Sequence, residues 1–354
     1  MSPRILVALD GTPQAERALS FAEVLARAAG GQLKVVRASA AGPTDYIERA
    51  LDAIARRLRE TGLPAEWSAE KGEAVPSVLE AARSWPADLI ALATTRSSAL
   101  DRWLNDGVAD AIVRSAEVPV LVVPPDRQRP SSPRPPRRIL VPLDGSRFAE
   151  QALGPAVELA GAVRAELILL RVIEEDDTPR HTHAHDAERY MQTVRDDVRA
   201  GLPERQVASH VAAGSATVAI AQATVDLAID LIAMSTRGRG GFVRAVMGST
   251  ATATLEQSTV PLLLVGPAAM RSASTAPGQV RRTRHMDPLN RTASNDTPNQ
   301  GPKGLGPEPA RATAHARTTV APAMLAYPAY DAIDEQGRQS FPASDPPSWT
   351  GSTI

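Results

Sequence analysis

Three segments of the chain occur twice in the same order, and this internal repeat constrains the fold more than any other feature of the sequence. They are RILVALDGTPQAERAL (4–19) with RILVPLDGSRFAEQAL (138–153), ADLIALATTR (87–96) with IDLIAMSTRG (229–238), and EVPVLVVPP (117–125) with TVPLLLVGP (259–267). The first pair is offset by 134 residues and the other two by 142, so the second copy has about eight additional residues between its second and third strands. The repeat predicts two homologous domains in tandem.

Each copy alternates short apolar runs with longer amphipathic segments. Runs of strand length include ILVAL (5–9), LIALAT (89–94) and VPVLVV (118–123), and segments with helical periodicity such as PQAERALSFAEVLARAA (13–29) separate them. Strands joined through helices pair in parallel, and strands that are apolar on both faces are typical of a sheet covered by helices on both sides. We therefore predict an α/β fold of two tandem, doubly wound, parallel five-stranded sheets.

The domain boundaries follow from the repeat and from a stretch of biased composition. The stretch PPDRQRPSSPRPPRR (124–138) is rich in proline and arginine, which disfavour burial in a sheet. We assign residues 126–137 to a linker between a first domain at 1–125 and a second domain at 138–267.

Residues 268–354 have the composition of a tail. The part from 268 to about 322 is poor in large apolar side chains, so burial cannot offset the entropy of ordering it, and we expect it to be disordered. The end of the tail has four aromatic residues among prolines and acids, namely Tyr327, Tyr330, Phe341 and Trp349. It is either disordered sequence with incidental aromatics or a short docking peptide that orders on an unknown protein partner.

Composition excludes several classes of function. The formal net charge of -1 over 354 residues gives no electrostatic reason to expect nucleic-acid or membrane binding. Cysteine is absent, which excludes disulfides and thiolate metal sites. The N-terminal sequence MSPRILVALDG lacks a signal-peptide pattern, and no apolar run approaches the roughly 18–20 residues of a membrane span. We expect a cytoplasmic protein.

A glycine-containing loop, STRGRGGFVRAVMGST (235–250), follows the fourth strand of the second copy. It lacks the lysine of a P-loop, but small residues before a helix start can direct backbone N–H groups at an anion. We expect Gly238, Gly248 and Ser249 to hold a phosphate through amides and a hydroxyl. Three arginines of the loop can add positive charge: Arg237, Arg239 and Arg244.

This loop and the repeat make residues 1–267 similar to two copies of the universal stress protein domain. The family's ATP-binding pattern is G-x2-G-x9-G-[ST], and the second copy matches it with Ser235, Gly238, Gly248 and Ser249, departing only at the first position. The resemblance implies ATP as the ligand, with magnesium as an optional companion. It also implies that Asp144 contacts the adenosine and that the backbone of Val172 lines the adenine pocket. The site residues expected from it are Pro142, Leu143, Asp144, Val172, Met234, Ser235, Gly238, Gly248, Ser249 and Thr250.

The first copy departs from the same pattern. An alignment without gaps puts Arg96 at the position of Gly238 and Asp106 at that of Gly248. A carboxylate beside the phosphates would repel them, so we predict that the first domain binds ATP weakly or not at all and serves for pairing. Asp10, which corresponds to Asp144, is interpreted as a cap of the turn or the first helix.

Two other motifs have competing interpretations. HTHAHD contains His181, His183 and His185, which would project three imidazoles to one side of an extended segment, as in a metal site. We place this run in the inserted loop or at the start of the second helix, exposed to solvent, and we assign no metal ligand. RGRGG could bind RNA, but a single copy after a buried strand in a neutral chain is weak support for that function.

These observations lead to two hypotheses. The first is an ATP-binding, cytoplasmic stress-response regulatory protein whose domains pair within the chain through their last strands, as a monomer or a homodimer. The alternative is a nucleotide-independent interaction or scaffold protein that recruits a partner through its tail. We assign no catalytic residue, because the chain has no G-x-S-x-G, H-E-x-x-H or pyrophosphatase loop, although slow ATP hydrolysis is compatible with the sequence.

Overall fold

The computed structural model describes residues 2–94, 107–124, 133–173, 180–203, 206–237 and 248–275. Predictions about Arg96, Asp106, Gly238, Arg239 and Arg244, about most of the linker, and about the tail beyond residue 275 lie outside these residues.

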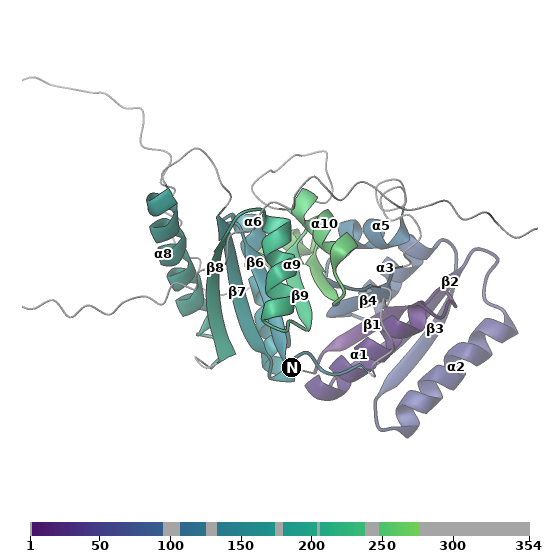
Figure 1. Ribbon diagram of the computed structural model, residues 1–354. Helices are drawn as coiled ribbons and strands as arrows, with labels where there is room; N and C mark the ends of the chain where they lie inside the picture. The colour runs from purple at the N-terminus through teal and green to yellow at the C-terminus, as the bar shows by residue number, and fades with distance from the viewer. Residues whose placement is uncertain are drawn as a thin grey trace, which may run out of the picture. The chain divides into compact units, whose positions relative to one another are not determined.

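The first domain follows the predicted alternation of strands and helices (Figure 1). Its elements are β1 (Arg4–Ala8), α1 (Ala15–Ala29), β2 (Gln32–Ser39), α2 (Asp45–Glu60), β3 (Ala65–Lys71), α3 (Ala74–Ser84), β4 (Leu89–Ala93), α5 (Val108–Ser115) and β5 (Val120–Val123). The ends of its helices have local causes. The Thr44 hydroxyl accepts a hydrogen bond from the Ile47 amide at 3.3 Å and so caps the start of α2, and Gly30 ends α1 in the left-handed region at φ 63°.

The second domain repeats this order with one helix divided and one helix added. Its elements are β6 (Arg138–Leu143), α6 (Arg147–Glu150), α7 (Leu153–Val163), β7 (Glu166–Ile173), α8 (Arg180–Val198), β8 (Val207–Ala213), α9 (Ala216–Asp226), β9 (Leu231–Ser235), α10 (Ser249–Gln257), β10 (Leu262–Val265) and α11 (Pro267–Thr275). Helix α6 begins where the Ser146 hydroxyl accepts from the Ala149 amide at 3.2 Å.

The strands of the described residues form one ten-stranded sheet in the order β3-β2-β1-β4-β5-β10-β9-β6-β7-β8. Strands within each domain are parallel, and β5 and β10 join the domains as an antiparallel pair in which Leu121 lies opposite Leu263. The predicted fold class and the predicted pairing through the last strands are therefore confirmed. The two predicted five-stranded sheets are halves of a continuous one.

Helices cover both faces of this sheet, and each face has one apolar core that extends through both domains. One core contains Leu25 of α1 and Met191 of α8, and the other contains Val78 of α3 and Leu255 of α10. Successive residues of a strand enter different cores: Leu6 lies in one core and Val7 in the other, and both are fully buried. Because the cores cross the β5–β10 seam, burial of apolar surface stabilises the domain pair as it stabilises each domain.

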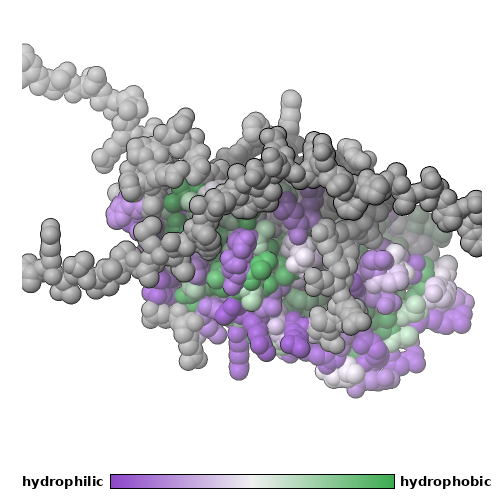
Figure 2. Space-filling model, in the orientation of Figure 1, coloured by the Kyte–Doolittle hydropathy of each residue, from purple (hydrophilic) through white to green (hydrophobic). Residues whose placement is uncertain are grey.

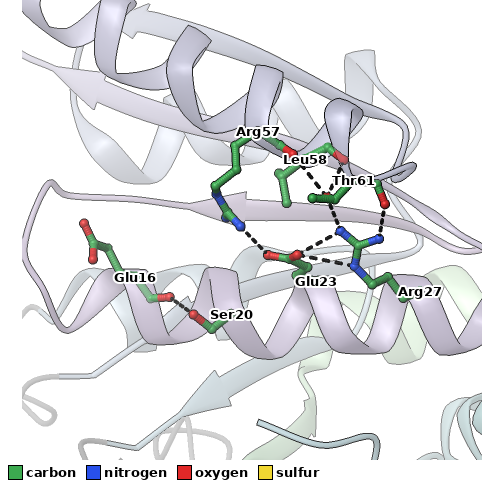
Figure 3. A network of polar contacts seen from close by, with 7 residues as sticks. All are labelled: Glu16, Ser20, Glu23, Arg27, Arg57, Leu58 and Thr61. Carbon is green, nitrogen blue, oxygen red and sulfur yellow. Dashed lines mark hydrogen bonds and ion pairs between the residues drawn. The ribbon is translucent and has the colours of Figure 1, made fainter. Parts of the chain in front are cut away.

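A polar cluster joins α1 to the end of α2 in the first domain (Figure 3). The Glu23 carboxylate accepts from Arg27 Nη2 at 2.9 Å and from Arg57 Nη1 at 3.1 Å, and Arg27 Nη1 also donates to the Thr61 carbonyl oxygen at 2.7 Å. The second domain replaces this cluster with close apolar packing. A Cβ built on Gly201, which follows α8, would lie 2.9 Å from Cγ1 of Val157.

Residues predicted to begin the disordered tail are helical, so the predicted start at residue 268 is wrong. Helix α11 extends from Pro267 to Thr275, and Ala268 and Ala269 are buried. The helix packs against α5 of the first domain. The short apolar residues of this helix give no strong periodic pattern in the sequence. Their burial depends on a helix of the other domain, which the local sequence does not show.

The histidine run lies in α8, in agreement with the second predicted location. The backbone of this run is therefore helical and not extended. The side chains of His181 and His183 lie outside the described part of the chain. Among the described residues, no group of three potential metal ligands is found, and no helix is both long and apolar enough to cross a membrane.

Candidate functional site

The carboxyl ends of β6, β7 and β9 meet at one edge of the sheet. Strand β6 pairs in parallel with β7 on one side and with β9 on the other, so the chain winds in opposite directions from β6. Ligands of open α/β sheets bind at such a switch point. The structure thus brings together the ends of three strands that carry the predicted residues Pro142, Leu143, Val172, Met234 and Ser235.

The turn after β6 is held by Asp144. Its Oδ1 accepts from the Ser146 amide at 2.8 Å, and Gly145 between them has φ 82°, a conformation that favours glycine. The first domain has the same turn, in which Asp10 Oδ1 accepts from the Thr12 amide at 2.8 Å. The capping role expected for Asp10 is confirmed, and Asp144 has the same role whether or not it also contacts a ligand.

The loop after β9 is closed by a hydrogen bond between its two ends. The Gly248 amide donates to the Thr236 carbonyl oxygen at 2.7 Å, and the Thr236 amide donates to the Val265 carbonyl oxygen of β10 at 3.1 Å. Thr236 is only 1% exposed, which fixes this anchor in the core. Thr236 could not be predicted from the sequence, because its role depends on a hydrogen bond to Val265, which is distant in the sequence.

Ser235, at the first position of the loop pattern, turns its hydroxyl onto the loop itself. The hydroxyl donates to the Arg237 carbonyl oxygen at 2.8 Å and accepts from the Arg237 amide at 3.1 Å. Ser235 and Met234 are both buried, so their side chains support the start of the loop. The departure from glycine at residue 235 is thus accommodated by a local turn.

Gly248 is the N-cap of α10, so a helix begins after the loop as predicted, but the local backbone does not require glycine at residue 248. Its φ of -65° and ψ of 153° suit any residue, and a built Cβ would meet the Thr236 carbonyl oxygen at an ordinary 3.5 Å. No side chain of the described residues caps this helix start. The first amides of α10, at Ser249 and Thr250, therefore form the kind of helix terminus that favours an anion, and the missing side chain leaves room for close approach.

The first domain differs at its helix start. The N-cap of α5 is Gly107, as Gly248 is that of α10, although the ungapped alignment pairs Gly107 with Ser249: α10 begins one residue earlier and has nine residues where α5 has eight. The next residue is Val108, 49% exposed, in place of Ser249. The first domain thus keeps the glycine and lacks the hydroxyl.

A buried acid adds to this difference. Asp110, the third residue of α5, is 7% exposed, whereas the third residue of α10 is Ala251. It pairs with Arg114 at 3.0 Å. Burial raises the pKa of the Asp110 carboxyl above its ordinary value, and the Arg114 charge opposes this shift. A carboxylate in the first turn of α5 makes this helix start less favourable for a phosphate than that of α10.

The end of β7 and helix α8 contribute polar residues near the predicted site that were not predicted from the sequence. Arg171 of β7 donates from Nη1 to the carbonyl oxygens of Val172 at 3.0 Å and Leu143 at 3.3 Å. Tyr190 of α8 donates to Oε1 of Glu150 at 3.0 Å. Burial and the Glu150 carboxylate raise the pKa of the Tyr190 phenol above its ordinary value, while the Arg171 charge opposes the rise.

A hollow of about 350 Å³ lies elsewhere, between the ends of α3 and α5 in the first domain. Its lining is mostly apolar, with Leu79, Ile90 and Val118 among the residues, and Arg83 and Glu117 lie at it as an ion pair 4.0 Å apart. It lies near the start of β4, whereas the predicted site lies at the carboxyl ends of the strands. It is therefore separate from the predicted site.

Known proteins resemble this chain in sequence and in fold. A universal stress protein of Mycolicibacterium smegmatis is 27% identical over 226 residues, which cover 62% of this chain and 76% of that protein. A universal stress protein of Thermus aquaticus is 32% identical over 137 residues, which cover 35% of this chain and 99% of that protein. Two crystal structures of universal stress proteins share the fold at 20% sequence identity. The structure from Archaeoglobus fulgidus has a TM-score of 0.56, and the match covers 75% of this chain and 98% of that protein. The structure from Pseudomonas aeruginosa has a TM-score of 0.59, and the match covers 77% of this chain and 95% of that protein.

The family assignment rests on both halves of the repeat. The sequence model of the universal stress protein family matches residues 1–124 and again residues 136–266, close to the predicted domain boundaries. Together the two matches cover most of the chain. The chain belongs to the universal stress protein family, of which it contains two tandem domains in one continuous sheet.

Proposed function

We propose that this protein is a nucleotide-binding regulatory protein of the cytoplasm, in which the second domain holds ATP and the first domain serves as its fixed partner. One observation carries the proposal: the hydrogen bond from Gly248 to Thr236 places the uncapped start of α10 at the switch-point edge of the sheet. Backbone amides and the Ser249 and Thr250 hydroxyls would hold the phosphates, with Asp144 and Val172 on the adenosine side. Magnesium would accompany the triphosphate.

The asymmetry between the domains supports a single site in each chain. The helix start of α10 offers a hydroxyl and no acid in its first turn, whereas α5 offers Val108 and the buried Asp110. Binding would change the surface that the end of β9 and the start of α10 offer to a partner, which is how a ligand with different affinity for two states acts as a signal.

Calorimetric titration of the full chain with ATP tests the proposal. We expect one site per chain, lost in Gly248→Asp, because the added carboxylate would point at the phosphates. The matched control is Gly107→Asp at the equivalent helix start of the first domain, which should leave ATP binding unchanged. Thermal unfolding of each variant without nucleotide shows whether it is folded. Absence of ATP binding by the unaltered protein would contradict the proposal.

The proposal is one of binding and not of catalysis. A single-turnover assay with ATP should release no more phosphate with the unaltered protein than with Gly248→Asp. Release above that control would contradict this part of the proposal and would call for a search for a general base near Asp144.

The alternative, an interaction protein that does not need a nucleotide, is favoured by one feature of α9. Val218 and Val225 of this helix are 66% and 75% exposed, and apolar surface is visible near the middle of the face that Figure 2 presents, where Figure 1 places α9. Exposed apolar residues on one helix are consistent with a contact surface. Under this alternative, Val218→Ser with Val225→Ser would abolish a partner interaction while ATP had no effect on it.

A further inference from the structure

A charged side chain occupies the place where a nucleotide base would meet the backbone. The ends of β6 and β7 lie side by side, with Leu143 opposite Arg171 in the parallel register. The carbonyl oxygens of Leu143 and Val172 both accept from Nη1 of Arg171, at 3.3 and 3.0 Å. The Arg171 guanidinium therefore bridges the carbonyl oxygen of Leu143, the last residue of β6, and the carbonyl oxygen of Val172 in its own strand β7.

Other polar residues lie around this guanidinium. Arg171 is partly buried, and its charge acts on the partly buried Tyr190 phenol, which donates a 3.0 Å hydrogen bond to Glu150. Asp144, in the turn after β6, also acts electrostatically on Tyr190. Residues from β7, α8, α6 and the β6 turn thus form one cluster around the base side of the proposed site.

The chemistry of guanidinium restricts which base fits beside it. Arginine carries only N–H donors and a permanent positive charge. The amino group at C6 of adenine is also a donor, so it would compete with Arg171 for the Val172 carbonyl and face another donor. The keto oxygen at C6 of hypoxanthine or guanine is an acceptor, so it would instead be attracted to the guanidinium.

We propose that Arg171 is a specificity-determining residue of the nucleotide site, and that through it the second domain accepts 6-oxopurine nucleotides at least as well as adenine nucleotides. This inference rests on the proposed nucleotide-binding function, which it extends from the phosphates to the base. It gives Arg171 a direct contact with the base.

The test compares ATP with inosine triphosphate, which shares its ribose and phosphates and differs only at C6 and the adjoining N1. Affinities of both nucleotides are measured by calorimetry for the full chain and for Arg171→Met, which keeps a long apolar stem and removes the donors. We expect the unaltered protein to bind inosine triphosphate at least as tightly as ATP. In Arg171→Met the ratio of affinities should shift toward ATP by about tenfold, the effect of losing a charged hydrogen bond.

A control and a second variant keep the test decisive. Arg37 is the equivalent residue of the first domain, where a Cβ built on Gly11 would lie 2.6 Å from its Nη1, so it packs on the corresponding turn. Arg37→Met should leave the ratio unchanged. If Arg171→Met is unfolded by thermal melting, Arg171→Gln, whose amide oxygen can accept from the adenine amino group, should shift the ratio in the same direction.

Each result has one meaning. A ratio of affinities that is the same in the unaltered protein and in the folded Arg171 variant would overturn the inference while leaving ATP binding intact, since a merely structural role affects both nucleotides equally. Failure of the unaltered protein to bind either nucleotide would overturn the proposed function, and this inference with it.

Discussion

Gly266 lies against the backbone of Val113 so closely that a Cβ at residue 266 would stand 1.8 Å from the Val113 carbonyl oxygen. Gly266 follows the last strand of the second domain, and Val113 belongs to α5 of the first. The two domains therefore meet by backbone contact beside the β5–β10 pair, and α11 begins at the next residue and packs on the same helix. A real Cβ could be accommodated only if α5 and the end of β10 moved apart.

We expect Gly266→Ala to lower the stability of the whole chain by about 1–3 kcal/mol, the usual cost of overpacking an interior. Unfolding followed by circular dichroism would measure it. The matched control is Gly154→Ala in α7, where a Cβ would meet nothing within 4 Å and the better helix propensity of alanine should raise stability slightly. Equal unfolding midpoints for Gly266→Ala and the unaltered protein would contradict this prediction, because they would show that α5 and the end of β10 can move apart without loss of stability.

The polar cluster on α1 predicts a second effect on stability. The Glu23 carboxylate bonds to both Arg27 and Arg57, and its side chain is only 18% exposed. We expect Glu23→Gln to reduce the free energy of unfolding by about 1–2 kcal/mol, because charged hydrogen bonds in a partly buried place are lost. Glu80→Gln is the control: Glu80 pairs with Arg83 at 2.8 Å, but both side chains are more than half exposed, so its loss should cost about 0–1 kcal/mol. An equal effect of the two changes, measured by urea denaturation, would contradict this interpretation.

The buried Asp110 predicts a pH-dependent effect with a defined sign. Burial raises the pKa of its carboxyl in the folded state above the unfolded value, so folding disfavours the ionised form, and Arg114 offsets only part of this. Its destabilising contribution is fully present above the folded pKa and disappears as the pH falls below the unfolded pKa, about 3.9. We therefore expect Asp110→Asn to have a higher melting temperature than the unaltered protein at pH 7, with the difference shrinking on acidification toward about pH 4. A variant less stable at neutral pH would show that the Arg114 pair outweighs burial.

The features that were predictable from the sequence are those carried by local pattern. The repeat, the strand lengths and the presence of a helix after the glycine-containing loop followed from apolar periodicity and glycine spacing, and the pairing of the last strands was an expectation from the family resemblance. The features that were missed depend on contacts between distant residues. Arg171 lies in an ordinary strand sequence, and only the adjacent end of β6 places the Leu143 carbonyl oxygen where its guanidinium can bind it together with the carbonyl oxygen of Val172. Thr236 is buried by β10, and α11 is ordered by α5 of the other domain.

The position of Gly107 as the N-cap of α5 could not be predicted for a similar reason. The strands on both sides and the helix ends keep the offset of 142 residues, but α5 begins one residue later than α10, and a sequence comparison does not show where each helix begins. The described residues add to the explanation of the asymmetry between the domains. They place a difference at Val108 and Asp110, in the first turn of α5.

That difference gives the last prediction, which transfers one residue of the first domain into the second. Ser249→Val copies Val108 at an exposed position, so the fold should tolerate it. Under the proposed function the change removes a hydroxyl that donates to a phosphate, and loss of such a charged hydrogen bond should weaken ATP binding about tenfold or more. The reciprocal Val108→Ser serves as the control and should leave the number of ATP sites at one, because Asp110 still lies in the first turn of α5. Calorimetry decides both. An unchanged affinity in Ser249→Val would mean that the backbone amides of α10 hold the phosphates alone, whereas a second site in Val108→Ser would mean that Asp110 is no barrier.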